Sequence, residues 1–168
     1  FLFTGSQAGG TIATAVKQGS GKSIGEMFVN LQTVYGDAIL APFLGNHDTM
    51  RPGSFMPGAE NLKMAAGVLS MMNGGVFVYY GEEIGMPGSG NDPSKRAPFY
   101  WNAARVNGTT NPPPECVLPE EYPCGSLEDQ IHDDDSLYNY YRQVIAIRNA
   151  LPVISHGRTT AEAALNVN

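Results

Sequence analysis

Two short segments that are apolar at nearly every position constrain the fold of this chain more than any other feature. They are "AILAPFL" (38–44) and "VFVYY" (76–80). Apolar runs of this length are typical of strands that are buried on both faces. Each follows a segment with apolar residues at helical spacing, 24–35 and 61–72 respectively. Helices and strands that alternate in this way predict an α/β fold with a parallel sheet.

The rest of the chain extends the same order. The opening "FLFTG" (1–5) predicts the tail of a further strand that runs into a glycine-rich turn. Residues 81–135 are rich in Gly, Pro and Asn, and they predict a long loop of the kind that faces a ligand. A final helix is expected to begin at Asp135 or Ser136, either of which can cap it, and to end by Gly157.

The composition argues against several classes of partner. The chain has 168 residues, of which 42% are hydrophobic and 15% charged, as is typical of a globular protein. Its net charge of −6, without a Lys/Arg cluster, argues against nucleic acid and anionic membranes as partners. No apolar stretch approaches transmembrane length. Because the chain begins at Phe1 without a methionine and ends within "AEAALNVN", we expect it to be a segment of a larger protein.

Polar residues follow both apolar runs. Asn46, His47 and Asp48 come directly after the first run, and Glu82 and Glu83 come after the second. In parallel α/β folds the chemistry gathers where strands end and loops begin. The sequence therefore predicts a functional site at this edge of the sheet.

The tetrapeptide "GNHD" (45–48) allows three interpretations. It occurs in metallophosphoesterases, but a metal centre needs further ligands. Upstream there are only Glu26 and Asp37, while His132 and His156 stand alone downstream, so this chain cannot complete the set and no metal site is expected. A second interpretation is carbohydrate chemistry, with a carboxylate that stabilises positive charge on a sugar. The third is a simple turn, which Asn and Asp favour.

The two cysteines, Cys116 and Cys124, lie in a proline-rich loop, "NPPPECVLPEEYPCGS". They lack the CxxC spacing of zinc and redox sites. Exposed free thiols in such a loop are a liability, so we expect a disulfide that closes the loop, with two unrelated thiols as the alternative.

Four blocks, in this order and at these spacings, carry a family resemblance. They are "FLGNHDTMR", "GVFVYYGEEIGM", "KRAPFYW" and "DDDSLYNYYRQVIAIRN". Together they resemble the α-amylase family of retaining glycoside hydrolases, and "SGNDPSKRAPFYWN" is similar to bacterial α-amylases that act on starch-like glucans. The resemblance implies the C-terminal portion of a (β/α)8 barrel for residues 1–157, from about strand 6 to helix 8. Residues 158–168 would then begin a C-terminal β domain.

The resemblance also implies roles for the residues of the first block. Asp48 corresponds to the family's third catalytic carboxylate, which is neither nucleophile nor proton donor and favours the oxocarbenium-like transition state. His47, Asn46 and Arg51 are expected to bind the sugar. Asn46 would also shape the turn, and Arg51 would pair with an acidic neighbour and steady the loop.

Other residues are expected around this centre. The rings of Tyr100 and Trp101 could stack on glucose. Glu82 and Glu83 are expected to be mainly structural and to tie their loop to its neighbours, with substrate contact as the alternative. Arg96 is expected to be structural beside the site.

The nucleophile and the general acid of a retaining mechanism are missing from this chain. Glu26 is rejected as the acid because it lies within an expected helix, away from the strand ends. The expected function is therefore that of a segment of an enzyme that cleaves α-1,4-glucans. It would contribute Asp48 and His47 to a barrel whose N-terminal part lies elsewhere. The alternatives are an α-glucosidase or glucanotransferase of the same family, and a non-catalytic glucan-binding relative.

The remaining expectations concern cofactor and location. Calcium is common in this family, but its usual ligands lie largely outside such a segment, so no cofactor is expected here. The protein is expected to be secreted or at the surface of a bacterium, with a cytoplasmic location as the alternative.

Overall fold

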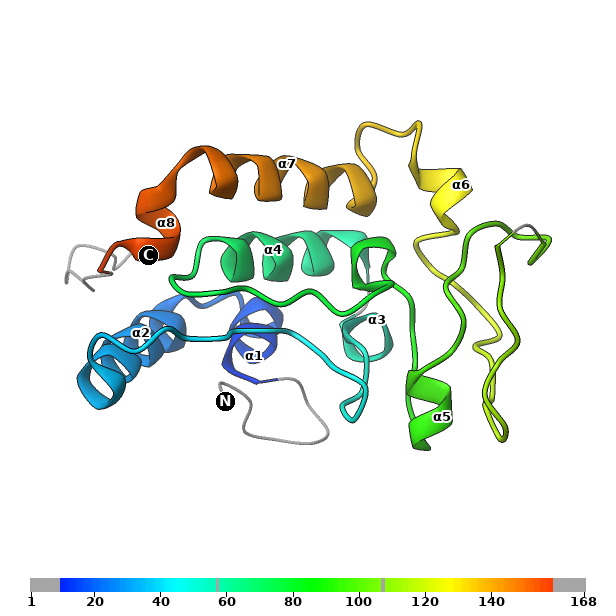
Figure 1. Cartoon of the computed structure of the whole chain (residues 1–168), viewed down its shortest axis with the longest axis horizontal. Helices are drawn as coiled ribbons and strands as arrows, with labels where there is room; N and C mark the ends of the chain where they lie inside the picture. Colours follow the sequence, from blue (N-terminus) through cyan, green and yellow to red (C-terminus); the bar gives the residue numbers. More distant parts are fainter. Residues whose placement is uncertain (1–9, 57, 107, 159–168) are drawn as a thin grey trace.

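A computed structural model describes residues 10–56, 58–106 and 108–158 (Figure 1). The strand predicted for 1–5 and nearly all of the expected β domain lie outside these residues. The described helices, in chain order, are α1 Thr11–Gln18, α2 Lys22–Tyr35, α3 Pro52–Phe55, α4 Ala59–Ser70, the 3-10 helix η1 Glu82–Ile84, α5 Asp92–Lys95, α6 Leu127–Gln130, α7 Leu137–Ala150 and α8 Pro152–His156.

The two apolar runs lie side by side and parallel, but neither is a regular strand. A parallel bridge joins Phe43 to Phe77, and the backbone N–H groups of Gly75 and Phe77 donate to the carbonyls of Leu40 (2.8 Å) and Pro42 (2.9 Å). The described residues contain no segment with a full strand ladder, so the predicted strands 38–44 and 76–80 are wrong as regular elements. Pro42 contributes to this result because it has no N–H to donate.

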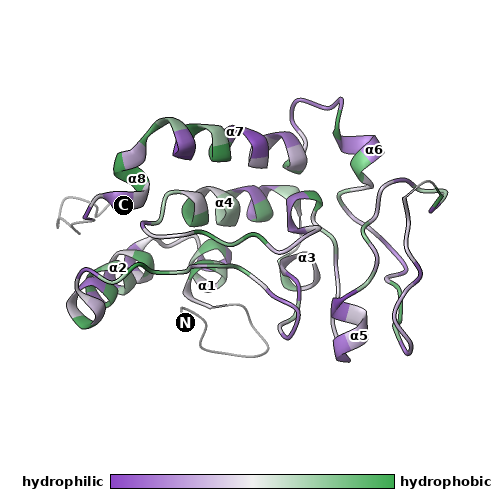
Figure 2. Ribbon diagram, viewed as in Figure 1, coloured by the Kyte–Doolittle hydropathy of each residue, from purple (hydrophilic) through white to green (hydrophobic). Residues whose placement is uncertain are grey.

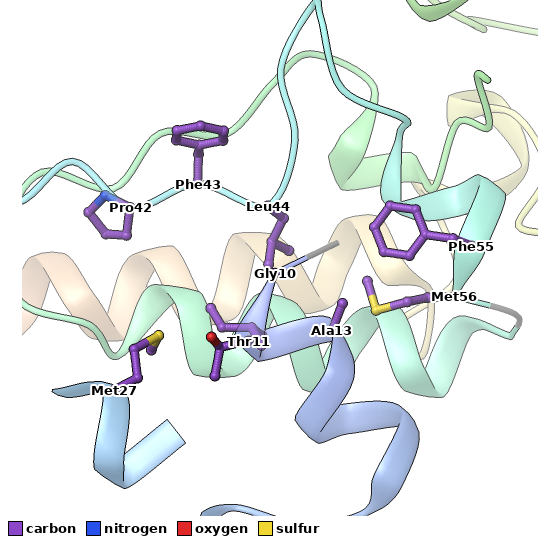
Figure 3. A pocket seen from close by; sticks show the side chains of 10 residues that line it. Gly10, Thr11, Ala13, Met27, Pro42, Phe43, Leu44, Phe55 and Met56 are labelled. Atoms are coloured by element: carbon purple, nitrogen blue, oxygen red, sulfur yellow. The ribbon is translucent and has the colours of Figure 1, made fainter. Parts of the chain in front are cut away.

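Only one face of this pair is covered by the described helices. Figure 3 shows Pro42 and Leu44 pointing toward the helices, whereas Phe43 points the opposite way. Leu44 is only 4% exposed, but Phe77 is 62% and Ile39 88% exposed. Within the described residues the expectation of burial on both faces is therefore wrong, since successive side chains of an extended segment point to opposite sides and the described helices cover only one of them.

The main core lies between the covered face and the helices. The apolar spacing over 61–72 predicted one buried face, and this is confirmed: Leu62, Ala65, Ala66 and Leu69 of α4 are buried, as is Met72 just after the helix. Helix α7 packs along α4 (Figure 1) and contributes Leu137 and Tyr141 to this core. Val144 of α7 is also buried, whereas Ile145 is 40% exposed. Burial of each large apolar side chain stabilises the fold by about 1.5–3 kcal/mol.

Side-chain hydrogen bonds mark the start of α7 and the end of α4. The Ser136 hydroxyl accepts a hydrogen bond from the N–H of Asn139 at 3.1 Å, which confirms one of the two predicted caps of α7. The guanidinium of Arg148 holds the chain after α4. Its partners are the carbonyl oxygens of Ser70 (2.7 Å), Met72 (2.5 Å) and Gly74 (2.5 Å). A cation at the end of a helix satisfies carbonyl acceptors that the helix leaves free.

Helix α1 is an element that the sequence pattern does not reveal. Its residues "TIATAVKQ" include β-branched Thr, Ile and Val, which are weak helix formers. The helix forms because Ile12, Ala13 and Ala15 are buried, the first two within the main core. Helix α2 occupies almost the predicted range, but none of its residues is buried, so its expected inner face is only partly covered.

The described residues of the predicted loop 81–135 include three short helices, η1, α5 and α6. Helix α6 begins with a capping box, in the sequence "SLED" (126–129). The Ser126 side chain accepts a hydrogen bond from the N–H of Asp129, and the Asp129 carboxylate accepts one from the N–H of Ser126 at 2.8 Å. Figure 2 shows polar residues at α5, at α6 and at the turn that precedes α3. Among the described helices, none combines the length and apolarity that crossing a bilayer requires.

Candidate active site

The turn after the first extended segment is organised by the side chain of Asn46. Its Oδ1 accepts hydrogen bonds from the N–H groups of Asp48 (2.9 Å) and Thr49 (3.0 Å), and its own N–H donates to Thr49 Oγ1 (2.9 Å). An asparagine that binds the backbone two residues ahead forms an Asx turn. This turn places His47 and Asp48 at its exposed tip.

Asp48 lies between an imidazole and a guanidinium. Arg96 Nη2 is 3.0 Å from Oδ1 of Asp48, and His47 Nε2 is 3.3 Å from Oδ2. The Asp48 side chain is 62% exposed, so its carboxylate remains open to a ligand. Both carboxylate oxygens therefore have a partner while the group stays accessible.

Two further charged residues belong to this cluster and were missed by the sequence analysis. Lys95 Nζ donates to the carbonyl of Asp48 at 2.8 Å, and Asp92 lies 3.6 Å from Arg96 Nη2. Lys95, 3.0 Å away, and then Arg96 lower the pKa of the exposed Asp92 carboxyl. The spacing of Asp92, Lys95 and Arg96 in "NDPSKR" is helical and could have signalled that they act as a group.

Arg51 is held inside the protein. It is 1% exposed, with Nε donating to the carbonyl of Lys95 (2.8 Å) and Nη1 to that of Tyr80 (2.6 Å). Its guanidinium carbon also lies 4.5 Å from the ring centre of Tyr79 and 4.6 Å from that of Tyr80. An acidic residue or a sugar was the expected partner of Arg51. Its side-chain hydrogen bonds go instead to the carbonyl oxygens of Tyr80 and Lys95, which enclose the guanidinium. Arg51 therefore steadies the turn from within.

Glu82 is buried within η1, as expected of a structural carboxyl. It is 4% exposed, and the Tyr141 hydroxyl donates to its Oε1 at 3.2 Å. Burial raises the pKa of Glu82 to about 8, although the hydrogen bond from Tyr141 opposes that shift. Burial also raises the pKa of Glu83, which Arg51 partly offsets. Glu82 thus links η1 to α7, away from solvent.

The aromatic pair expected to stack on sugar divides into two environments. Tyr100 is half-buried and stacks on Tyr122, with ring centres 3.9 Å apart, and Arg105 lies over both rings. Trp101 is 42% exposed, and its ring packs against that of Phe99, with the ring centres 4.5 Å apart. The indole of Trp101 is therefore the more accessible surface of the two.

An open pocket of about 350 Å³ adjoins the turn. It is lined on one side by Ala41, Phe43, Gly45 and Asn46, and on the other by Phe77, Val78 and Tyr79. It lies along the uncovered face of the two extended segments and reaches the turn at Asn46. An apolar hollow that ends at polar groups has the character of a ligand site.

The expected disulfide between Cys116 and Cys124 is wrong, because both cysteines are free thiols. Cys116 packs against the small cluster of Ile84, Met86 and Ala97, whereas Cys124 packs against the main core. Apolar packing of each thiol replaces the bridge, and burial raises the pKa of both.

We therefore expect two alkylatable thiols in protein that has never been reduced. Unfolding in denaturant with iodoacetamide, without a reductant, should add two carbamidomethyl groups by mass spectrometry. A Cys116→Ser variant should add one group. An unmodified mass for the unreduced protein would contradict the two packing sites.

Metal-ligating groups do not gather here. Within residues 10–56, 58–106 and 108–158, three or more His, Cys, Asp or Glu side chains never come together as a metal site would require. Glu26, the rejected general acid, is an exposed residue of α2 whose carboxylate lies 4.0 Å from Lys22 Nζ.

The sequence matches the family model described as alpha amylase, catalytic domain, over residues 6–157. Alpha-amylase 3 of Dictyoglomus thermophilum is 33% identical over 137 residues, which cover 79% of this chain and 26% of that protein. Alpha-amylase SusG of Bacteroides thetaiotaomicron is 32% identical over 133 residues, which cover 77% of this chain and 19% of that protein. Other relatives are named oligo-1,6-glucosidase and 4-alpha-glucanotransferase.

The fold also matches that of a solved structure, Eubacterium rectale Amy13B. The TM-score is 0.86 at 34% identity, over 96% of this chain and 33% of that one. The chain thus spans a third or less of the length of each of these relatives.

Proposed function

The chain belongs to the alpha-amylase catalytic-domain family, and from that premise we propose that it is part of a retaining glycoside hydrolase that cleaves α-1,4 bonds in starch-like glucans. In this proposal residues 1–157 are the last part of its (β/α)8 barrel, and residues 158–168 begin the C-terminal β domain. The observation that carries the proposal is the exposed Asp48 carboxylate between His47 and Arg96, at the end of one of two parallel extended segments.

Asp48 acts in this proposal as an electrostatic stabiliser. Its accessible negative charge would face the positive charge that develops on the sugar ring in an oxocarbenium-like transition state. His47, also at the exposed tip of the turn, would donate a hydrogen bond to a sugar hydroxyl. Trp101 would offer its exposed indole to a neighbouring glucose ring.

The open apolar face supports the remaining part of the proposal. Side chains such as Ile39 and Phe77 stand uncovered there, and the chain spans only 26% of Alpha-amylase 3. In a barrel, inward-pointing side chains of neighbouring strands pack in layers. We infer that the N-terminal part of the barrel covers this face and supplies the nucleophile and the general acid. Calcium, if the enzyme binds it, would be held largely outside this segment. We propose a secreted or surface location in a bacterium, with a cytoplasmic location as the alternative.

A second candidate is an α-glucosidase or glucanotransferase of the same family. Relatives that carry the names oligo-1,6-glucosidase and 4-alpha-glucanotransferase match this chain, which favours keeping this candidate. All three activities need the same carboxylate, so the residues of this segment serve each of them. A non-catalytic glucan-binding relative would keep the turn and lose the reaction.

The protein that carries the complete barrel should release reducing sugar from soluble starch, and NMR should detect the α-anomer of the new end first. Isomaltose as substrate separates the α-1,6 activity, and transfer products from maltotriose separate the glucanotransferase. Residues 1–168 alone should hydrolyse no starch, because both the nucleophile and the acid of a retaining mechanism are absent. Hydrolysis by residues 1–168 alone would contradict this assignment, and so would β-anomeric products.

A further inference from the structure

Three hydrogen-bond donors from the end of α5 converge on the two residues at the tip of the turn. Lys95 Nζ donates to the carbonyl of Asp48 at 2.8 Å. Arg96 donates through Nε to the carbonyl of His47 at 3.2 Å and through Nη2 to Asp48 Oδ1 at 3.0 Å. The side chain that carries the carboxylate is therefore held by an element more than 40 residues away in the sequence.

The local turn cannot hold the Asp48 carboxylate by itself. Asn46 Oδ1 accepts only from backbone N–H groups, those of Asp48 and Thr49, and His47, whose Nε2 lies 3.3 Å from Asp48 Oδ2, is itself an exposed side chain. An exposed side chain of this kind otherwise distributes among several staggered rotamers. Arg96 removes that freedom because one planar guanidinium binds a backbone atom of the turn and the carboxylate together.

The far side of α5 is fixed to the same turn by a second set of contacts. Arg51 donates from its backbone N–H to the carbonyl of Gly88 (2.9 Å) and from Nε to that of Lys95 (2.8 Å). The N–H of Gly88 in turn donates to Ser54 Oγ at 2.7 Å. A Cβ at Gly88 would lie only 2.8 Å from Arg51 Cδ, so the two segments meet closely. Residues 46–54 and 88–96 therefore hold each other at both ends.

We propose that Arg96 is a positioning residue that orients the Asp48 carboxylate toward the sugar, with α5 as its rigid support. This inference rests on the proposed function of Asp48 and goes beyond it, since it assigns a role to a residue that need not touch the substrate. Arg96 acts through geometry as well as charge. A lysine in its place retains the charge but cannot make the two planar contacts at once.

The experiment uses the protein that carries the complete barrel and a double-mutant cycle between Arg96 and Asp48. Arg96→Gln should lower kcat by about 100-fold with little change in KM, since a small displacement of a reacting group costs about that much. Arg96→Lys should lose most of the same activity. In an Asp48→Asn background, Arg96→Gln should add almost no further loss, because the carboxylate that Arg96 orients is gone.

The matched control is Lys22→Gln, which removes one cation from the exposed surface of α2 and should leave kcat unchanged. Thermal melting of each variant reports any loss of fold. Equal losses from Arg96→Gln in both backgrounds would overturn the positioning role, as would full activity of Arg96→Lys. Near-normal activity of Asp48→Asn alone would instead refute the role of Asp48 on which the inference rests, so the two failures are distinguishable.

Discussion

Replacing Asp48 with asparagine is expected to lower the turnover of α-glucans by at least about 10²–10³-fold in the protein that carries the complete barrel, the loss seen when one electrostatic stabiliser is removed from an active site. Asparagine has the same shape and keeps an oxygen that can accept from Arg96, 3.0 Å away in the native cluster. It lacks the negative charge that favours the transition state. KM should change much less than kcat, because the lost interaction matters most as charge develops on the sugar.

Steady-state kinetics of Asp48→Asn, with and without a chelator, distinguish this role from the two others considered for the turn. A simple turn former would tolerate asparagine, and turnover would stay close to that of the native protein. A metal ligand would make the variant respond to added divalent ions. Asp134→Asn is a suitable control because it removes one exposed carboxylate ahead of α7 while leaving the Asp48 cluster intact.

The free energy of unfolding is expected to fall as the pH rises from about 4.5 to about 8, because of Glu82. Burial raises the pKa of this carboxyl from its ordinary value of 4.5 to about 8 in the folded protein. Between these values the folded state keeps a proton that the unfolded state has lost. The contribution of Glu82 to the free energy of unfolding is therefore fully present below pH 4.5. Between pH 4.5 and pH 8 this contribution declines by about 1.4 kcal/mol per pH unit.

Urea unfolding at several pH values between 5 and 8 measures this slope. Glu82→Gln should flatten it, since glutamine has a similar shape, can still accept from the Tyr141 hydroxyl and does not ionise. Burial also raises the pKa of Glu83, so a shallower slope of the same sign should remain in that variant. Glu120→Gln, on the exposed surface, is the control and should leave the slope unchanged. A native protein whose stability did not depend on pH in this window would contradict the burial of Glu82 as a neutral acid.

The site was predictable from sequence to the extent that its parts are local. Asn46, His47 and Asp48 follow directly from an apolar run, and the order of four short blocks identified the family before any contact was known. Lys95 and Asp92 were missed as members of the site, and Arg51 was assigned the wrong partner. The errors on Lys95 and Arg51 have one cause: their contacts join residues 29 to 47 positions apart, and no periodicity in the sequence encodes such a pairing. Asp92 could have been found, because it lies at helical spacing from Lys95 and Arg96.

The sequence by itself determined the long helices α2, α4 and α7 and the cap of α7 at Ser136, because these features depend on side chains a few residues apart. The alternation of helices with apolar runs also predicted that the two runs are parallel neighbours. Only the tertiary structure decided that these runs form a single bridge with one face open, that α1 is a helix, and that Cys116 and Cys124 stay apart. Such features depend on what packs against a segment, and packing outweighs weak local preference. The same holds for Asp48: its position in the chain is local, but the orientation of its carboxylate is set by Arg96 from a neighbouring loop.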